Sequence, residues 1–457
     1  MTDPSTGAAR TPATGDARRQ PSRRTVLRRV AATASATTLA ALAGCAVDDD
    51  GGNGDDSAGG DGDGGGDGDD EADRSADAVP DLPRVEDPPD AVYVPTHREA
   101  MRTLEPIDAG EYRLAPMLSY PHRFWLVDGE NRELVEPDRP GVHLMITLWD
   151  AETGVVLPVG SNVSIRLRKD GEAVGSPRTP WSMLSQQMGV HFGDNVPLEE
   201  DGTYGVEVTV PPPSIETTGA LEGRMTESDT VTFEFTYDEA FRDEVVGGVE
   251  YLDEEYWGRP GALEPMDHAR HSADHDGGDD HERIPYSTLS PAAELPGTPV
   301  RESTDGSGDP DESGGDDGDG TEDAESERDL EPTSGDATFV VRLLEPGSRL
   351  ADEGDGYLLI SPRTPYNRVP LPEMALSATV EREGETVTRP DVTQRIDDEY
   401  GLHYGASVED VRPGDAVTIE IDSPPQVSRH AGYETAFVDM PALELTVPDD
   451  ATTDSDA

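Results

Sequence analysis

The sequence predicts an all-β protein with two tandem immunoglobulin-like antiparallel β-sandwich domains, joined by a disordered acidic linker. The first observation is a repeat, because Gly189–Val196 (GVHFGDNV) returns as Gly401–Val408 (GLHYGASV), each about twenty residues before a pair of prolines. The second is strict alternation of apolar and polar residues in several short segments, which is typical of half-buried strands. The third is closely spaced turn residues without any long stretch of helical period.

The repeat extends beyond these two segments. Residues His143–Pro158 align without a gap on Tyr357–Pro372, at a constant offset of 214 positions. Downstream, Gly205–Val210 and Ala416–Ile421 both read as strands that run into prolines. Three landmarks in the same order indicate that one module was duplicated.

The first domain is assigned to residues 80–251. Its clearest predicted strands are Val163–Arg168, Tyr204–Val210 and Thr230–Phe235. Asp-Gly pairs lie between such segments and favour tight turns. Short β-branched strands separated by turns are typical of an immunoglobulin-like sandwich.

The second domain is assigned to residues 336–449, with a short tail at 450–457. Its predicted strands are Thr338–Leu343, Ala378–Val380 and Val417–Ile421. Between the domains, residues 252–335 are dominated by Asp, Gly, Ser and Pro. Such a segment buries too little apolar surface to fold, so we expect a disordered, acidic, histidine-containing linker.

The amino terminus carries an export pattern. Arg23 and Arg24 precede an apolar run from Val30 to Leu42, and the run ends in Leu-Ala-Gly followed by Cys45. Residues 1–45 therefore read as a twin-arginine signal peptide with a lipobox, in which Cys45 receives lipid. A transmembrane anchor is the alternative, but the run is shorter than the roughly 20 apolar residues that span a bilayer. We expect a lipid-anchored protein on the outer face of the cytoplasmic membrane.

The charge balance excludes one class of partner. The chain has 97 acidic and 35 basic residues, a net charge of −62, and Lys169 is its only lysine. Nucleic-acid binding needs clustered basic residues, so nucleic acid is not expected as a partner. A surface this acidic is typical of a halophilic protein, because concentrated salt screens its self-repulsion. Residues 46–79 continue the bias and read as a disordered Asp/Gly tether.

Cysteine content and motifs argue against an enzyme. Cys45 is the only cysteine, so the chain has no internal disulfide, no cysteine nucleophile and no thiolate metal site. The sequence has no G-x-S-x-G elbow, H-E-x-x-H helix or phosphate-binding loop. We therefore expect no catalytic residues.

The repeated motif carries a resemblance. The order Gly-x-His-aromatic-Gly, then a strand and a proline pair, resembles the exported iron- and copper-binding proteins that partner high-affinity iron permeases. The resemblance implies a metal-binding protein accessory to iron or copper transport, with a permease as a possible partner. It also implies His191, His403 and His430 as metal ligands.

Other side chains join the candidate ligands. Met183 and Met188 lie just before His191, and a thioether beside imidazoles suits copper or iron. The alternative is that these methionines only pack. His122 and His143 are candidates to complete a first-domain site with His191.

The sequence departs from the family pattern, which also has an acidic residue shortly before the histidine that corresponds to His191, and its two domains differ from each other. The family pairs its early histidine with a glutamate two residues later, and here that residue is Phe124. In the second domain, Tyr357 stands where the first has His143. Histidines also commonly orient turns by hydrogen bonding, which is the alternative role for His191 and His403.

A further set of histidines lies in the predicted linker, at positions 268, 271, 275 and 281. Interleaved His and Asp can collect divalent ions, and the alternative is a solvated spacer. The alternative function for the whole chain is a non-catalytic surface lipoprotein that kept the fold and lost the metal site. The sequence leaves the metal, the permease and the oligomeric state open.

Overall fold

The computed structural model describes residues 82–157, 163–266, 284–287, 295–302 and 331–448. All of them belong to one compact unit, residues 71–457. The predicted signal peptide with Arg23, Arg24 and Cys45, the tether at 46–79, the linker histidines and the tail at 450–457 lie outside the described residues.

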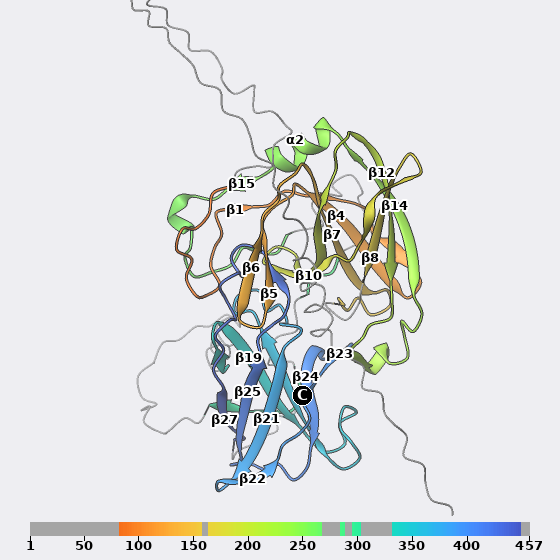
Figure 1. Cartoon of the computed structure of the whole chain (residues 1–457). Helices are drawn as coiled ribbons and strands as arrows, with labels where there is room; N and C mark the ends of the chain where they lie inside the picture. Colours follow the sequence, from red (N-terminus) through yellow and green to blue (C-terminus); the bar gives the residue numbers. More distant parts are fainter. Residues whose placement is uncertain (1–81, 158–162, 267–283, 288–294, 303–330, 449–457) are drawn as a thin grey trace, which may run out of the picture. The chain divides into compact units, whose positions relative to one another are not determined.

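The first module comprises residues 82–157 and 163–266, and most of its regular secondary structure is strand (Figure 1). Its strands are β1 (His97–Arg98), β2 (Arg102–Thr103), β3 (Ile107–Ala109), β4 (Tyr112–Ser119), β5 (Phe124–Asp128), β6 (Asn131–Val135), β7 (Gly141–Asp150), β8 (Ser164–Lys169), β9 (Glu172–Arg178), β10 (Trp181–Ser185), β11 (Gly189–Pro197), β12 (Gly202–Val210), β13 (Glu216–Thr218), β14 (Asp229–Tyr237) and β15 (Glu250–Tyr251). Its helices are the 3-10 turns η1 (Gly219–Leu221) and η2 (Glu254–Tyr256) and the α-helix α2 (Glu239–Gly247), which Asp238 caps by accepting from the Phe241 N–H.

The second module comprises residues 295–302 and 331–448. Its strands are β16 (Thr298–Pro299), β17 (Arg301–Glu302), β18 (Thr333–Ser334), β19 (Ala337–Leu344), β20 (Gly356–Arg363), β21 (Ala375–Arg382), β22 (Glu385–Thr388), β23 (Thr393–Asp397), β24 (Gly401–Val408), β25 (Ala416–Ser423), β26 (Ser428–Arg429) and β27 (Leu443–Thr446).

Each module is a pair of sheets. In the first module, β2-β4-β7-β11-β10 form one sheet and β14-β12-β8-β9 the other. In the second, β16-β19-β20-β24-β23 and β17-β27-β25-β21-β22 follow the same order. The prediction of an all-β, sandwich-type fold is confirmed, and the matching strand orders agree with the sequence repeat.

Alternation along the strands builds the cores. In β7, Leu144, Ile146 and Leu148 are fully buried between the two sheets of the first module, against Val206 and Val208 of β12. A one-residue shift would move this whole apolar set to the other face. The intervening residues of β7 therefore point to the opposite face of their sheet, where the candidate ligands lie.

The two modules exchange short strands. After the prolines that follow β25, β26 pairs with β10 of the first module in parallel. After the prolines that follow β12, β13 pairs with β23 of the second module, also in parallel. The exchange is reciprocal, so each module completes a sheet of the other.

Several segments of the predicted linker differ from the disordered chain that composition suggests, and two of them show why. Leu263 is buried, and its N–H donates to Gln186 Oε1 at 2.7 Å. β16 and β17 pair with β19 and β27 of the second module, and Val300 between them is buried. The average composition of 252–335 conceals these few apolar residues, which are enough to hold their segments against the modules.

No helix among the described residues is both long enough and apolar enough to span a bilayer.

Candidate metal centre

Three of the predicted ligands lie on the outer face of the first module's larger sheet. His143 on β7 pairs with Asn195 on β11, and His191 on β11 pairs with Met183 on β10. Directly paired residues in an antiparallel ladder share a face. Their neighbours along the strands point the other way, into the core, so these imidazoles face away from it.

Asn195 positions two of the histidines. Its Oδ1 accepts the Nδ1–H of His143 at 2.9 Å and the backbone N–H of His122 at 3.3 Å. Its Nδ2 donates to the backbone carbonyl of His122 at 2.8 Å. The loop between β4 and β5 is thereby held over β7, which brings His122 above His143.

The fourth histidine arrives from the second module. His430 follows β26, and its N–H donates to the carbonyl of Leu184 on β10 at 3.1 Å. The adjacent Arg429 is fully buried, and its guanidinium donates to the carbonyls of Pro425, Tyr433 and Ala436. This anchoring fixes the loop that carries His430 beside the first module.

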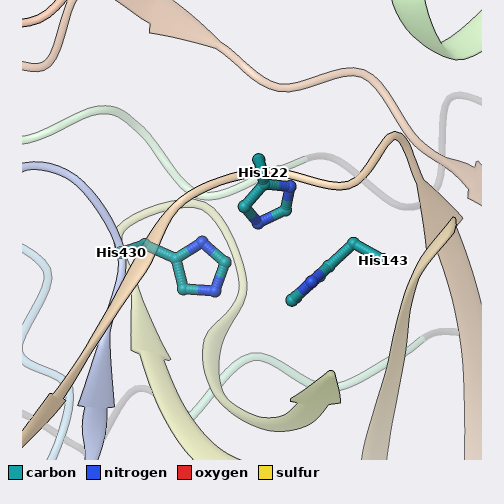
Figure 2. Close-up of side chains that lie close together, drawn as sticks. All are labelled: His122, His143 and His430. Carbon is teal, nitrogen blue, oxygen red and sulfur yellow. The ribbon is translucent and has the colours of Figure 1, made fainter. Parts of the chain in front are cut away.

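These side chains converge on one point. Ligand atoms of His122, His143 and His430 all lie within 4.8 Å of one another, and Figure 2 shows the three rings turned toward a common space. The ring of His191 lies 5.2 Å from that of His430. Three imidazole nitrogens bound at about 2.1 Å to the same ion lie about 3.4–3.6 Å from one another, so ligand atoms at the 4.8 Å limit would move together by about 1 Å on binding. We call these four residues the histidine centre.

The hydrogen bonds leave the inward nitrogens free. The Nδ1 atoms of His122, His143 and His191 contact the oxygens of Tyr120, Asn195 and Gly189, respectively. Such acceptors hold the proton on Nδ1 and leave the Nε2 lone pair available. All three Nε2 atoms, and both ring nitrogens of His430, are buried without a hydrogen-bond partner. Buried polar atoms are rarely left unpaired, so these nitrogens are available as metal ligands.

A carboxylate completes the donors. Glu99 Oε1 lies 3.6 Å from His122 Nε2 and 3.5 Å from His430 Nδ1. The family that the motif resembles has a glutamate two residues after its early histidine, and here that position is the buried Phe124. The structure supplies the carboxylate from the segment just after β1 instead. No local pattern around Glu99 marks it, so sequence reasoning missed it.

The electrostatics favour a cation. Burial lowers the pKa of His122 to about 4 and that of His191 to about 3. Burial and the neighbouring His122 also lower the pKa of His143 well below 6.5. Although burial opposes its ionisation, His122 and His430 hold the pKa of Glu99 well below its usual range. At pH 7 these three imidazoles are neutral ligands beside a carboxylate, a donor set that suits a dication.

Met183 lies at the edge of the centre. A Cβ placed on Gly193 would stand 2.8 Å from Met183 Sδ and 2.9 Å from His143 Nε2, so these two atoms can be no further apart than the sum of those distances. Glycine at position 193 thus leaves room for both side chains. Met188, the other predicted methionine, packs instead in a cluster of buried methionines.

His403 does not join the histidine centre. Its Nδ1 contacts the Gly401 carbonyl at 3.0 Å, as His191 contacts Gly189, but its Nε2 lies 3.3 Å from the hydroxyl of Tyr357. Both ring nitrogens therefore have partners. Tyr357 occupies the position of His143 and lies over Gly405 as His143 lies over Gly193.

The other residues around His403 also differ from those around His191. The pairing of His403 with Arg395 matches that of His191 with Met183. The exchanged strands share the same register, which puts Thr218 where the first module receives His430. Arg395 donates to the Tyr357 hydroxyl at 3.3 Å and Thr218 to Asp397 at 2.5 Å. An arginine, a tyrosine and a threonine thus replace three donors.

Comparisons with known proteins give limited matches. A family model described as a domain of unknown function (DUF7350) matches residues 322–446, and no curated protein matches the chain. A copper-bound variant of FetP from a uropathogenic Escherichia coli strain is similar, with 25% identity over 30% of this chain and 97% of that chain, at a TM-score of 0.25. FetP as isolated from the periplasm has 22% identity over 31% of this chain and 95% of its own, at a TM-score of 0.24.

Proposed function

We propose that this chain is a lipid-anchored, extracytoplasmic and non-catalytic protein that binds a copper or iron ion at the histidine centre, as an accessory to metal transport. The supporting observation is the set of unpartnered imidazole nitrogens aimed at one buried point. The amino-terminal export pattern supports the location, and the resemblance of the repeated motif supports the role.

The donor set favours copper within this proposal. Imidazole ligands suit copper and iron, whereas Mg²⁺ and Ca²⁺ prefer oxygen donors. Among divalent ions, nitrogen sites bind Cu(II) most tightly. A thioether near His143, from Met183, adds a ligand type that copper accepts. We therefore expect Cu(II) to bind more tightly than Fe(II) when each is offered alone.

The second candidate is a surface protein whose histidines have only a structural role. The second module supports that reading for its own position, because His403 is hydrogen bonded through both ring nitrogens. It does not fit the first module. There, several imidazole nitrogens are buried without partners, and each such group costs about 1–3 kcal/mol when nothing binds it.

Calorimetric titration with Cu(II) in concentrated salt tests the proposal. Wild-type protein is expected to bind one ion, and His122→Gln with His143→Gln is expected to abolish this uptake. His403→Gln is the matched control, since it removes a buried histidine of the same motif outside the centre. Glu99→Gln is expected to weaken binding by about 10–100-fold, because it removes the charge and keeps the shape. Equal uptake by wild type and the double variant would leave only the structural reading.

A further inference from the structure

Beside the histidine centre, the structure gathers methionines. Met101, Met117, Met145 and Met188 are all buried and form a cluster of their own, with the partly buried Met266 packed against it. We call these five residues the methionine cluster. No leucine, isoleucine, valine or aromatic residue belongs to it. Met225, Met374 and Met440, by contrast, are dispersed in the two large apolar cores.

The cluster shares a sheet face with the histidine centre. Met117 on β4 pairs with Met145 on β7, and the next pair on that face is Ser119 with His143. Two residues along a strand span about 7 Å, so Met145 starts one step away from His143. Met188 comes from the turn between β10 and β11, where its N–H donates to Ser185 Oγ at 3.2 Å. The thioethers therefore adjoin the imidazoles without being the same ligand set.

Packing alone does not account for this choice of residue. On their opposite face, the same two strands bury Leu114, Leu118, Leu144 and Ile146 in an ordinary aliphatic core. Leucine fills a volume similar to that of methionine and has fewer rotamers to lose. On the other face, each of the two strands places one methionine, Met117 on β4 and Met145 on β7, and these two are directly paired. The distinguishing property of methionine is its soft sulfur.

Thioether sulfur selects soft cations. Methionine and cysteine favour Cu(I), whereas carboxylate and carbonyl oxygens favour hard ions. The five thioethers are uncharged ligands, and a singly charged soft cation costs less to bury among them than a doubly charged one. Met266 is the partly exposed member, and it joins the cluster to the surface.

We propose that the methionine cluster is a second metal site, specific for a soft monovalent cation of the Cu(I) class and separate from the histidine centre. The site is argued from the methionines themselves and does not rest on the function proposed for the histidines. Together with Cu(II) at the histidine centre, which rests on the proposed function, the methionine cluster would place the two oxidation states of copper side by side.

The test uses the whole mature chain and Cu(I) under anaerobic conditions, with bicinchoninate as the competing chelator. Wild-type protein is expected to withdraw Cu(I) from the chelator, and X-ray absorption is expected to show sulfur neighbours. Met117→Leu with Met145→Leu and Met188→Leu keeps the volume and removes three sulfurs. We expect it to bind Cu(I) at least about tenfold more weakly and to retain Cu(II) uptake at the histidines.

Two further variants separate the sites. Met225→Leu with Met374→Leu and Met440→Leu removes three methionines elsewhere, and it should bind Cu(I) like wild type. His122→Gln with His143→Gln should lose Cu(II) and keep sulfur-bound Cu(I). Circular dichroism establishes that each variant is folded. Unchanged Cu(I) affinity in the folded cluster variant, or only nitrogen neighbours around Cu(I) in the wild type, would overturn the proposal.

Discussion

At the residue scale, the partner of Nε2 determines whether each motif histidine can bind a metal. In both modules, the Nδ1 of the histidine contacts the carbonyl of the glycine two residues earlier, which turns Nε2 toward the neighbouring strand. In the first module that strand presents His143, and Nε2 of His191 stays unpartnered. In the second it presents Tyr357, whose hydroxyl lies 3.3 Å from Nε2 of His403. A single residue type on the neighbouring strand separates a candidate ligand from a structural histidine.

Buried histidines make the stability of the metal-free protein depend on pH. The unfolded chain titrates near 6.5, whereas the pKa is about 4 for His122 and His403 and about 3 for His191 in the folded state. Below pH 6.5 the unfolded state therefore binds more protons, and the folded state loses stability as pH falls. Each histidine contributes up to about 1.4 kcal/mol per pH unit until its folded pKa is reached. Urea unfolding at constant high salt between pH 7 and about 4.5 measures the slope.

The control for this prediction replaces one of the groups. His191→Gln is expected to reduce the slope by about one histidine's share, because it removes one proton of difference between the two states. Carboxyl groups with lowered pKa values, such as Glu99, lose stability only below their usual 4.5 and so fall outside this window. A free energy of unfolding that stays constant from pH 6.5 to about 4.5 would contradict the assignment of these histidines as buried and neutral.

The sequence identified all four members of the histidine centre, but it also included a histidine that lies elsewhere and missed the nearby carboxylate. It named His122, His143, His191 and His430, because a repeated motif and the two flanking histidines are visible in one dimension. It also named His403. The Tyr357 hydroxyl contacts Nε2 of His403, and this contact depends on the pairing of two strands, which the sequence does not show. It missed Glu99, since a carboxylate near an irregular segment looks like any other in so acidic a chain.

At the element scale, a strand of two residues completes the centre. β26 pairs with β10 in parallel, and its backbone leads directly into His430. So short a strand is fixed by its side chains more than by its ladder. Arg429 holds this strand in place, because its guanidinium donates to carbonyls of the same loop. Burial lowers the pKa of Arg429 to about 9, so the side chain is still charged at pH 7. Arg429 is therefore a positioning residue for His430.

Arg429→Leu is expected to destabilise the fold and to weaken metal binding together. It leaves three buried carbonyl groups without their donor, and each costs about 1–3 kcal/mol, so the total is expected to be about 3 kcal/mol or more. Cu(II) affinity should fall even though every ligand is present, because His430 loses its support. Urea unfolding and titration measure the two effects. Arg139→Leu, at an exposed arginine, is the control, and equal behaviour of the two variants would remove the anchoring role.

The elements themselves were largely predictable, and the exchange was not. Strands such as β12 and β25 show the two-residue period along their whole length, which local sequence reveals. β13 and β26 have three and two residues, too few for any period. Their partners lie in the other module, at a distance in sequence where only tertiary packing decides the pairing. His430, which follows β26, could be identified as a candidate ligand from its motif, but the sequence could not show that it contacts the first module.

At the scale of the whole molecule, the duplicated chain has two corresponding positions and builds only one of them as a centre. The reciprocal exchange of β13 and β26 gives each module a segment from the other. One segment delivers His430 to the histidine centre, and the other delivers Thr218, which pairs with Asp397 and donates to its carboxylate. The guanidinium of Arg395 places a permanent positive charge where the first module has Met183, which opposes binding of a metal cation.

Restoring the missing donors should restore a second site. The variant Thr218→His with Tyr357→His and Arg395→Met places three donors at positions equivalent to His430, His143 and Met183 and frees the Nε2 of His403. We expect this variant to bind two Cu(II) ions, the second more weakly because the added histidines lack counterparts of His122, Asn195 and Glu99. Calorimetric stoichiometry measures the gain, and Tyr357→His alone is the control, expected to stay at one ion because Arg395 remains. If the triple variant folds, keeps one ion and gains none, the two positions are not equivalent, and the repeat extends to the fold alone.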